Sequence, residues 1–204
     1  DSILMAITAT YADPTVLGEF REFLRCQRMY VFTINGFPYG AFHGTRVKEE
    51  VYLPDWRDPE RLRYTNLLSD LLAKLLPDEA GMEGSVSTVP GAYKPALAGS
   101  GDVEAMTEHL LRHVAHLVHL RVRSGRLIAL ALEPEPNCFL ETIDEVVDFF
   151  EHHLHGPAAV ARLIELTGMF GVAMTPKAGA HGELCGLLCI RAALDARGDA
   201  REVI

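Results

Sequence analysis

The sequence predicts an α/β protein, a single-domain, incomplete (β/α) TIM barrel over residues 1–204. Short apolar segments alternate with longer segments of helical period, the order typical of a parallel sheet covered by helices. No GxGxxG or phosphate-binding loop follows the first apolar segment, which favours a barrel over an open doubly wound sheet. Long polar loops follow the apolar segments, where a barrel places its site. About five β/α units are present, so the predicted barrel is partial.

The individual elements follow from residue type and spacing. Short runs of β-branched and apolar residues predict strands at 3–8, 29–34, 84–89, 127–132 and 170–174. Apolar residues spaced three and four apart predict helices at 14–27, 59–76, 102–122, 141–154, 157–166 and 184–196. The pair Asp13–Pro14 is typical of a helix start, and Pro77 is typical of a helix end.

Composition excludes several classes of protein. Of 204 residues, 49% are hydrophobic, which is enough for a buried core and argues against disorder. The net charge of −9 disfavours nucleic-acid binding, since phosphate contacts need clustered Lys and Arg. No run of 18 apolar residues is present, so no membrane span is expected. Four cysteines without a CxxC pair fit a reducing, cytoplasmic setting.

Glu133 is the strongest candidate for a site residue. It stands at the end of the predicted strand 127–132, where a barrel binds metals and sugars. Glu135 and Asn137 follow in the loop and are candidates for substrate binding. Oxygen ligands of this kind suit Mg, Mn or Zn, so a divalent metal on Glu133 is expected. A solvated carboxylate at a strand end is the alternative.

The loop after the second predicted strand is the densest cluster of polar and aromatic residues. Asn35, Tyr39 and His43 offer polar groups beside flat apolar faces, which suits a small polar metabolite. His43 is the candidate base. A self-packed loop over the end of the sheet is the alternative. Lys94 is a candidate for binding an anionic group of the substrate, with a solvated lysine as the alternative.

Four histidines share the predicted helix 102–122: His109, His113, His116 and His119. Their spacings of four, three and three place them on one helix face. No HExxH motif accompanies them, so a partly exposed histidine-rich surface is expected rather than a metal site.

Several long segments resemble one family. They read VFTINGFPYGAFHG, VKEEVYLPDW, RLRYTNLLSDLLAKLLP, GSVSTVP and LALEPEPNCFLETIDEV. They resemble the EboE-type metabolite traffic proteins, in the sugar phosphate isomerase/epimerase group with a xylose-isomerase-like TIM barrel. The resemblance implies a bacterial, cytoplasmic metabolite traffic protein, with other proteins of the same gene cluster as partners. It also implies that Glu133 is a metal ligand, because Glu133 matches the metal-binding glutamate of the group.

The final segment departs from that family. Thr175 and Ala178 stand where the family pattern has Asp and His, and residues 168–204 are divergent. If catalysis occurs, we expect metal-assisted proton abstraction next to a carbonyl, with Glu133 and His43 as catalytic residues. The alternatives are a non-catalytic metabolite-binding or interaction module, or a truncated fragment without activity of its own.

Overall fold

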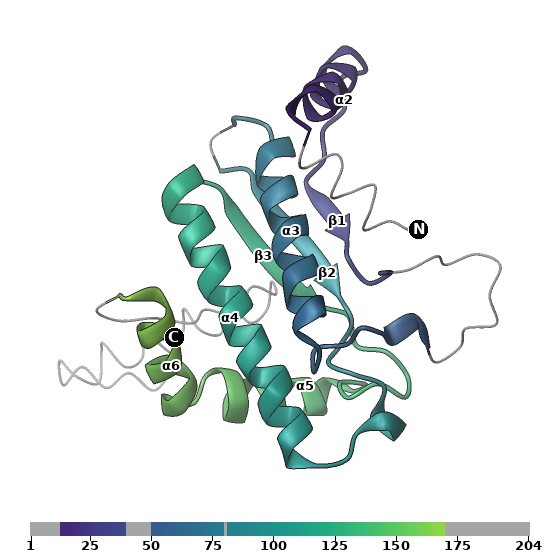
Figure 1. Ribbon diagram of the computed structural model, residues 1–204, viewed down its shortest axis with the longest axis vertical. Helices are drawn as coiled ribbons and strands as arrows, with labels where there is room; N and C mark the ends of the chain where they lie inside the picture. The colour runs from purple at the N-terminus through teal and green to yellow at the C-terminus, as the bar shows by residue number, and fades with distance from the viewer. Residues whose placement is uncertain (1–12, 40–49, 80, 170–204) are drawn as a thin grey trace, which may run out of the picture. The chain divides into compact units, whose positions relative to one another are not determined.

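The computed structural model describes residues 13–39, 50–79 and 81–169, and all of them lie in one compact unit, Asp1–Phe170 (Figure 1). Its sheet consists of β1 (Thr33–Asn35), β2 (Glu83–Thr88) and β3 (Leu127–Leu132). The strands are parallel and lie in the order β1-β2-β3. The register is set across the sheet, with Ile34 opposite Val86 and Val86 opposite Leu130.

The prediction of a (β/α) barrel, complete or partial, is wrong. The three strands of the described residues form an open sheet, in which β1 and β3 are the edge strands. The alternating pattern could not separate the two architectures, because a barrel and an open parallel sheet use the same β/α units joined by right-handed crossovers. The lack of a GxGxxG motif bears on nucleotide binding and leaves sheet closure undetermined.

The helices are set by local sequence signals. The α-helices are α2 (Pro14–Cys26), α3 (Pro59–Leu75), α4 (Ser100–Ser124), α5 (Ile143–Phe149) and α6 (Pro157–Thr167). Asp13 and Asp58 cap α2 and α3 by accepting backbone N–H bonds, each followed by proline at the first helical position. Thr142 and Glu145 form a capping box at α5. A π-helix, Phe150–Leu154, continues α5.

Most of the expected elements within the described residues are confirmed. The predicted strand 127–132 matches β3, and the predicted helix 14–27 ends one residue later than α2. The predicted strand 29–34 is wrong in its extent, because β1 covers only Thr33–Asn35. The backbone N–H of Met29 donates to the carbonyl of Leu24 in α2, so the backbone at Met29 is still bonded to the helix and not to the sheet. The predictions for 3–8, 170–174 and 184–196 fall outside the described residues.

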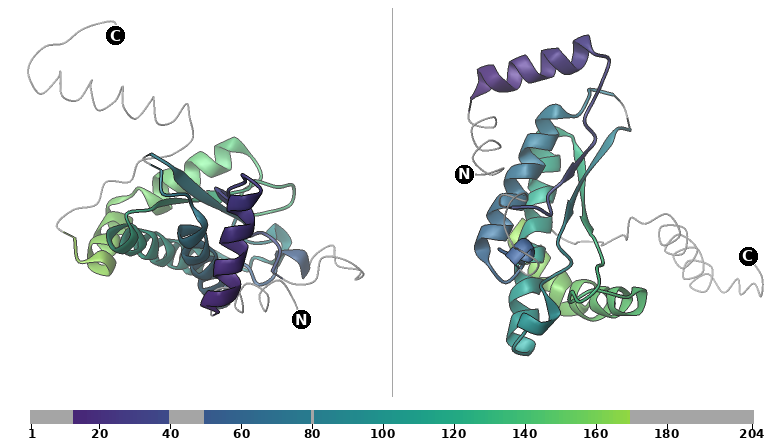
Figure 2. Two further views of the ribbon diagram at one scale, coloured as in Figure 1. Left: turned by 90° about the horizontal axis from the view of Figure 1, so that it is seen from above. Right: turned by 90° about the vertical axis from the view of Figure 1, so that its right-hand side faces the viewer.

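The core lies between the sheet and two helices. Helices α3 and α4 lie against one face of the sheet (Figures 1 and 2). Val86 and Ile128 pack there against Leu68 and Leu72 of α3 and Leu120 of α4, all nearly inaccessible to solvent. The opposite face carries small residues, among which Thr33, Asn35 and Ala131 are exposed in the described part of the chain.

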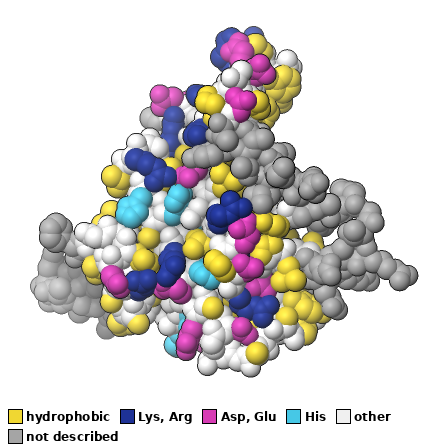
Figure 3. Space-filling model, viewed as in Figure 1, with side chains coloured by type: hydrophobic (Ala, Val, Ile, Leu, Met, Phe, Trp, Pro, Cys, Tyr) yellow, Lys and Arg dark blue, Asp and Glu magenta, His cyan; other side chains and the backbone are white. Residues whose placement is uncertain are grey.

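Helix α2 packs on the outer side of α3. Leu17 and Leu24 of α2 are buried against Leu71 and Leu75 of α3. The other side of α2 leaves large apolar side chains in solvent, and Phe23 is 52% exposed. On the face shown in Figure 3, acidic and basic side chains are intermingled over α3 and α4. Among the helices that the structure describes, none has the length and apolar character needed to cross a membrane.

Candidate functional site

Three loops interlock at the carboxyl end of the sheet, where ligands bind in open parallel sheets. The backbone N–H of Trp56 donates to the carbonyl of Gly91 at 3.1 Å, which joins the loop before α3 to the loop after β2. The N–H of Lys94 donates to the carbonyl of Asn137 at 2.8 Å, which joins that second loop to the loop after β3. The backbone of the three loops therefore forms one connected layer.

An aromatic cluster fills the space between these loops. The ring of Tyr52 stacks on Tyr93 with centroids 5.6 Å apart and meets Phe37 edge-on at 5.7 Å. The Tyr52 hydroxyl donates to a carboxylate oxygen of Glu135 at 3.2 Å. Burial, with the neighbouring Cys138 and Glu135, raises the pKa of Tyr52 to about 12. Tyr52 therefore stays neutral and acts as a hydrogen-bond donor at physiological pH.

Buried Cys138 lies under this cluster and faces Tyr93 in an isolated antiparallel bridge. Burial raises the pKa of the Cys138 thiol to about 11. A thiol of this kind is protonated at neutral pH and is a poor nucleophile. The residues of this layer that sequence reasoning missed are Tyr52, Tyr93 and Cys138. Tyr52 and Cys138 lie in the family-like motifs VKEEVYLPDW and LALEPEPNCFLETIDEV, whereas Tyr93 lies outside all of the quoted motifs.

Two of the predicted site residues lie at the carboxyl ends of strands. Asn35 ends β1, and its side-chain oxygen accepts the N–H of Phe37 at 2.9 Å and the hydroxyl of Ser87 at 3.5 Å. Glu133 follows β3 directly, and its backbone N–H donates to the carbonyl of Thr88 at 3.1 Å. Glu133 therefore lies where the sequence placed it, whereas Asn35 was expected in the loop and ends the strand instead. Their catalytic or binding roles stay predictions.

The other predicted residues do not converge on one point. Tyr39 points toward α3, where its hydroxyl donates to Glu60 at 2.6 Å and its ring meets Tyr64 edge-on at 5.0 Å. Asn137 is exposed, with a left-handed backbone (φ 64°). His43 falls outside the described residues.

Lys94 is held by acidic neighbours. Its ammonium group contacts Glu145 at 2.7 Å and Glu141 at 3.1 Å. Hydrogen bonds to these two carboxylates raise the pKa of Lys94 above its ordinary range. Both carboxylates compete with any anionic ligand for this ammonium group, so the structure gives the predicted substrate role of Lys94 no support.

The histidine row of α4 is partly exposed, as expected, since His109 and His116 are half-buried and His119 is exposed. His113 departs from that expectation, because it is fully buried. Its Nδ1 contacts the side-chain oxygen of Asn66 at 2.7 Å, and His116 contacts Asp70 at 3.0 Å. His109 contacts the backbone carbonyl of Trp56 at 2.8 Å. The histidine spacing therefore serves the packing of α4 on α3 and on the loop before α3.

The expectation of a divalent metal is wrong. In the part of the chain that the structure describes, no three His, Cys, Asp or Glu side chains come together in an arrangement that could hold a metal ion. Glu133 and Glu135 supply carboxylates, but Glu135 is already engaged by the Tyr52 hydroxyl. A strand-end carboxylate alone is a poor predictor of metal binding, because coordination needs several converging ligands.

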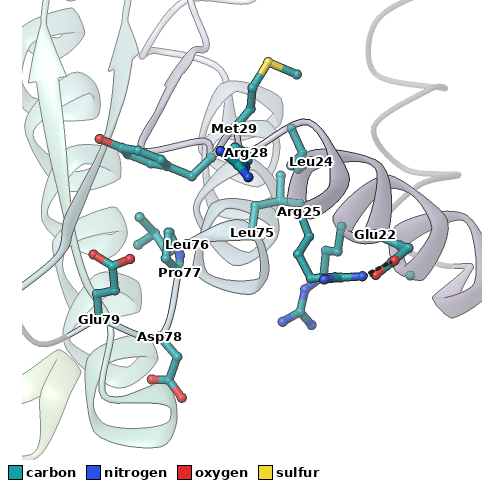
Figure 4. Close-up of a pocket in the computed structure, with 13 residues that line it drawn as sticks. Glu22, Leu24, Arg25, Arg28, Met29, Leu75, Leu76, Pro77, Asp78 and Glu79 are labelled. Carbon is teal, nitrogen blue, oxygen red and sulfur yellow. Dashed lines mark hydrogen bonds and ion pairs between the residues drawn. The ribbon is translucent and has the colours of Figure 1, made fainter.

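A groove lies away from this edge, where α2 and the turn after α3 meet (Figure 4). It encloses about 680 Å³ and is open to solvent. Leu24, Leu75 and Leu76 form its apolar part. Arg25 beside it is paired with Glu22 at 2.6 Å. The groove brings together none of the residues singled out from the sequence.

A smaller groove of about 480 Å³ lies at the amino end of the sheet, between the turn before β2 and the turn before β3. It is lined by Asp78, Glu79, Met82 and Arg126, among others. Arg126 is paired with Asp78 at 3.3 Å, and the side chain of Asp78 is exposed to solvent.

Comparison with known proteins contradicts the resemblance to EboE-type proteins. No family model and no solved structure matches the chain. A curated relative from Caulobacter vibrioides, a probable glycine dehydrogenase (decarboxylating) subunit 2, is 76% identical over 105 residues. That match covers 42% of this chain and 20% of the relative. The sugar phosphate isomerase/epimerase and metabolite traffic assignments are therefore wrong, as is the xylose-isomerase-like fold.

Shorter matches carry the same name. A protein from Thiobacillus denitrificans is 59% identical over 44 residues, which cover 21% of this chain and 9% of that protein. One from Legionella pneumophila is 37% identical over 76 residues, covering 37% of this chain and 13% of that protein. The chain thus spans at most about a fifth of the length of these relatives. It is similar, over part of its length, to bacterial proteins named probable glycine dehydrogenase (decarboxylating) subunit 2.

Proposed function

We propose that this chain carries a section of a protein of the glycine dehydrogenase (decarboxylating) subunit 2 type, and that the described residues serve it as scaffold. The observation that carries this proposal is the 76% identity to the Caulobacter vibrioides protein over 105 residues. Identity at that level over a stretch of this length supports common descent of the matched section. The matched stretch covers 20% of that relative, whose name describes one subunit of an enzyme, so we propose that this section works as part of a larger, multi-subunit protein.

The described residues do not supply the chemistry that the name implies. Pyridoxal phosphate, when bound, would supply the electron sink that decarboxylation of glycine needs, and a lysine would hold the cofactor in the resting protein. The described lysines are Lys74, in the last turn of α3, and Lys94, which is paired with two glutamates. Neither lines either of the two grooves. The described residues therefore do not fit this cofactor, and we assign no catalytic step to them.

The geometry favours a supporting role for a second reason. The polar side chains at the carboxyl end of the sheet bond to one another and to loop backbone, and Tyr52, Glu135 and Lys94 are all engaged. Groups engaged in this way stabilise a loop layer, and they are poorly available for a substrate. We expect the purified chain alone to release no carbon dioxide from glycine.

A segment exchange tests the proposal. The matched stretch of the Caulobacter vibrioides protein is replaced by its counterpart from this chain, and glycine-dependent release of ¹³CO₂ from carboxyl-labelled glycine is measured. We expect the hybrid to keep activity within a few-fold of the parent, because a homologous section packs in the same place. A hybrid with a shuffled stretch of the same composition is the control. A soluble, folded hybrid without activity would contradict the proposal.

A further inference from the structure

Four buried polar atoms near the carboxyl end of the sheet have no hydrogen-bond partner among the described residues. They are Trp56 Nε1, Arg61 Nη2, Thr88 Oγ1 and His113 Nε2. All four residues are completely inaccessible to solvent. Buried polar groups in native proteins are almost always paired with protein or with ordered water, so four unpaired atoms in one small unit need an explanation.

Two of these atoms are chemically complementary. The rings of Trp56 and His113 lie 6.0 Å apart between centroids, tilted by 56°. The indole N–H of Trp56 can only donate. The side-chain oxygen of Asn66 accepts from His113 Nδ1 at 2.7 Å, so the proton sits on Nδ1 and Nε2 presents a lone pair. The indole N–H of Trp56, a donor, and Nε2 of His113, an acceptor, thus belong to neighbouring buried rings and form no hydrogen bond with each other.

We propose that a buried water molecule bridges the indole N–H of Trp56 and Nε2 of His113. The third partner in this proposal is the hydroxyl of Thr88, which ends β2 on the same buried sheet face as Val86, the face that α3 and α4 cover. Two ordinary hydrogen bonds through one water span roughly 5 Å between the outer heavy atoms, which suits rings with centres 6.0 Å apart. Buried waters typically make about three hydrogen bonds to groups that otherwise have none.

The chemistry of the pair selects water over an ion. The ligand must accept a hydrogen bond from the indole N–H and donate a hydrogen bond to the imidazole nitrogen. An anion meets the lone pair of His113 unfavourably, and a cation meets the N–H of Trp56 unfavourably. Burial lowers the pKa of His113 to about 3, so the imidazole is neutral and offers an anion no charge. A small neutral molecule with both functions satisfies the site.

This water completes the attachment of the loop before α3 to helix α4. The backbone N–H of Trp56 already bonds Gly91, and its carbonyl is contacted by His109 of α4. The indole is the remaining polar group of the residue. A water bridge from the indole to His113 fixes the side chain of Trp56 as well as its backbone. The loop before α3 is thereby held in place against α4.

The single tryptophan makes the site directly observable. The full chain, labelled with ¹⁵N, gives one indole N–H signal, and NOE and ROE transfer from water to that proton is measured. We expect NOE and ROE peaks of opposite sign, as for a water that stays longer than the protein tumbles. The transfer is expected to disappear in His113→Phe with an otherwise native spectrum. A wild-type indole proton without transfer from water would overturn the proposal.

The variant Thr88→Val gives a second, independent readout, because it replaces a hydroxyl by a methyl group of the same shape. If Thr88 bonds the water, the variant unfolds at lower urea concentration than the parent. If the hydroxyl has no partner, its removal leaves the midpoint unchanged or raises it, which would overturn the role of Thr88. Thr65→Val is the matched control, since its buried hydroxyl donates to the carbonyl of Arg61 at 2.8 Å and its loss lowers the midpoint in either case.

Discussion

The guanidinium group of Arg61 donates to the carbonyl of Gly36 at 2.8 Å and so joins the first turn of α3 to the residue that follows β1. The same side chain donates to the carbonyls of Phe37 and Pro54. Arg61 is fully buried, and its hydrogen-bond partners among the described residues are backbone carbonyls. Burial lowers its pKa to about 10. A positive charge is retained in the core because three backbone carbonyls need a donor that can reach all of them.

Replacing Arg61 by Lys tests this relationship. A lysine keeps the charge but cannot hold the planar, forked geometry that reaches three carbonyls at once. We expect the free energy of unfolding to fall by about 2–4 kcal/mol, since buried carbonyls lose their donor. Urea unfolding measures the change. Arg63→Lys is the control, because Arg63 forms an exposed pair with Glu60 and its loss costs at most about 1 kcal/mol. Equal losses in the two variants would show that the buried fork is unimportant.

Two glycine-to-alanine substitutions should change the free energy of unfolding in opposite directions. A Cβ atom on Gly36 would lie 2.6 Å from Leu68 Cδ1 and 2.8 Å from the carbonyl oxygen of Ser87. Gly36→Ala therefore overpacks the junction of β1 and α3, and we expect a loss of about 1–3 kcal/mol. Gly18, inside α2, has no atom within 4 Å of that position. Gly18→Ala should gain about 0.5–1 kcal/mol, because alanine favours helix.

Chemical denaturation of both variants shows whether the free energy of unfolding rises or falls, provided that its dependence on denaturant concentration is unchanged. A neutral Gly36→Ala would mean that Leu68 moves aside without cost. A destabilising Gly18→Ala would mean that α2 packs on its exposed side.

The stabilisation from the ion pair between Glu108 of α4 and Arg162 of α6 should depend on pH. Glu108 accepts two hydrogen bonds from Arg162, which lower its pKa to about 2, with Arg112 adding to the effect. A folded pKa below the unfolded value means that this stabilisation is complete above about pH 4.5. It is lost as the pH falls from there toward about 2. The free energy of unfolding of Glu108→Gln should therefore fall less steeply across that range.

The measurement is the free energy of unfolding at a series of pH values between 7 and 3. Glu165→Gln is the control, because Glu165 also pairs with Arg162 but its side chain is 72% exposed. We expect the control to keep the slope of the parent. Identical slopes for the parent and Glu108→Gln would exclude the proposed contribution.

His113 should make the chain acid-sensitive in a higher range. Burial, with a smaller effect of His116, lowers the pKa of His113 from 6.5 to about 3. Between these values the unfolded chain binds the proton and the folded chain does not, so stability falls as the pH drops below 6.5. In His113→Gln this slope should shrink, whatever the variant's stability at neutral pH. The free energy of unfolding at pH 7, 6, 5 and 4 tests it, and a slope equal to that of the parent would refute the assignment.

The candidate site shows what residue patterns alone can locate. Glu133 was expected directly after a strand and lies there, because the apolar run that forms β3 is a local signal. Asn35 was expected in a loop after a strand at 29–34 but is the last residue of β1. Tyr39 was expected in the same site, but it turns to Glu60 and Tyr64 of α3. The partners of a loop side chain are chosen by the packing of distant elements, and spacing along the chain carries no information about them.

The sequence by itself determined where three of the helices begin. Asp13, Asp58 and the Thr142–Glu145 box cap helices through neighbours at most three residues away, so the signal is local. Tertiary structure alone decided that the sheet is open, that His113 is buried, and that Tyr52 meets Glu135 across 83 positions of the chain. Apolar periodicity shows that one face of an element is covered, but the covering partner is set by the packing of the whole chain.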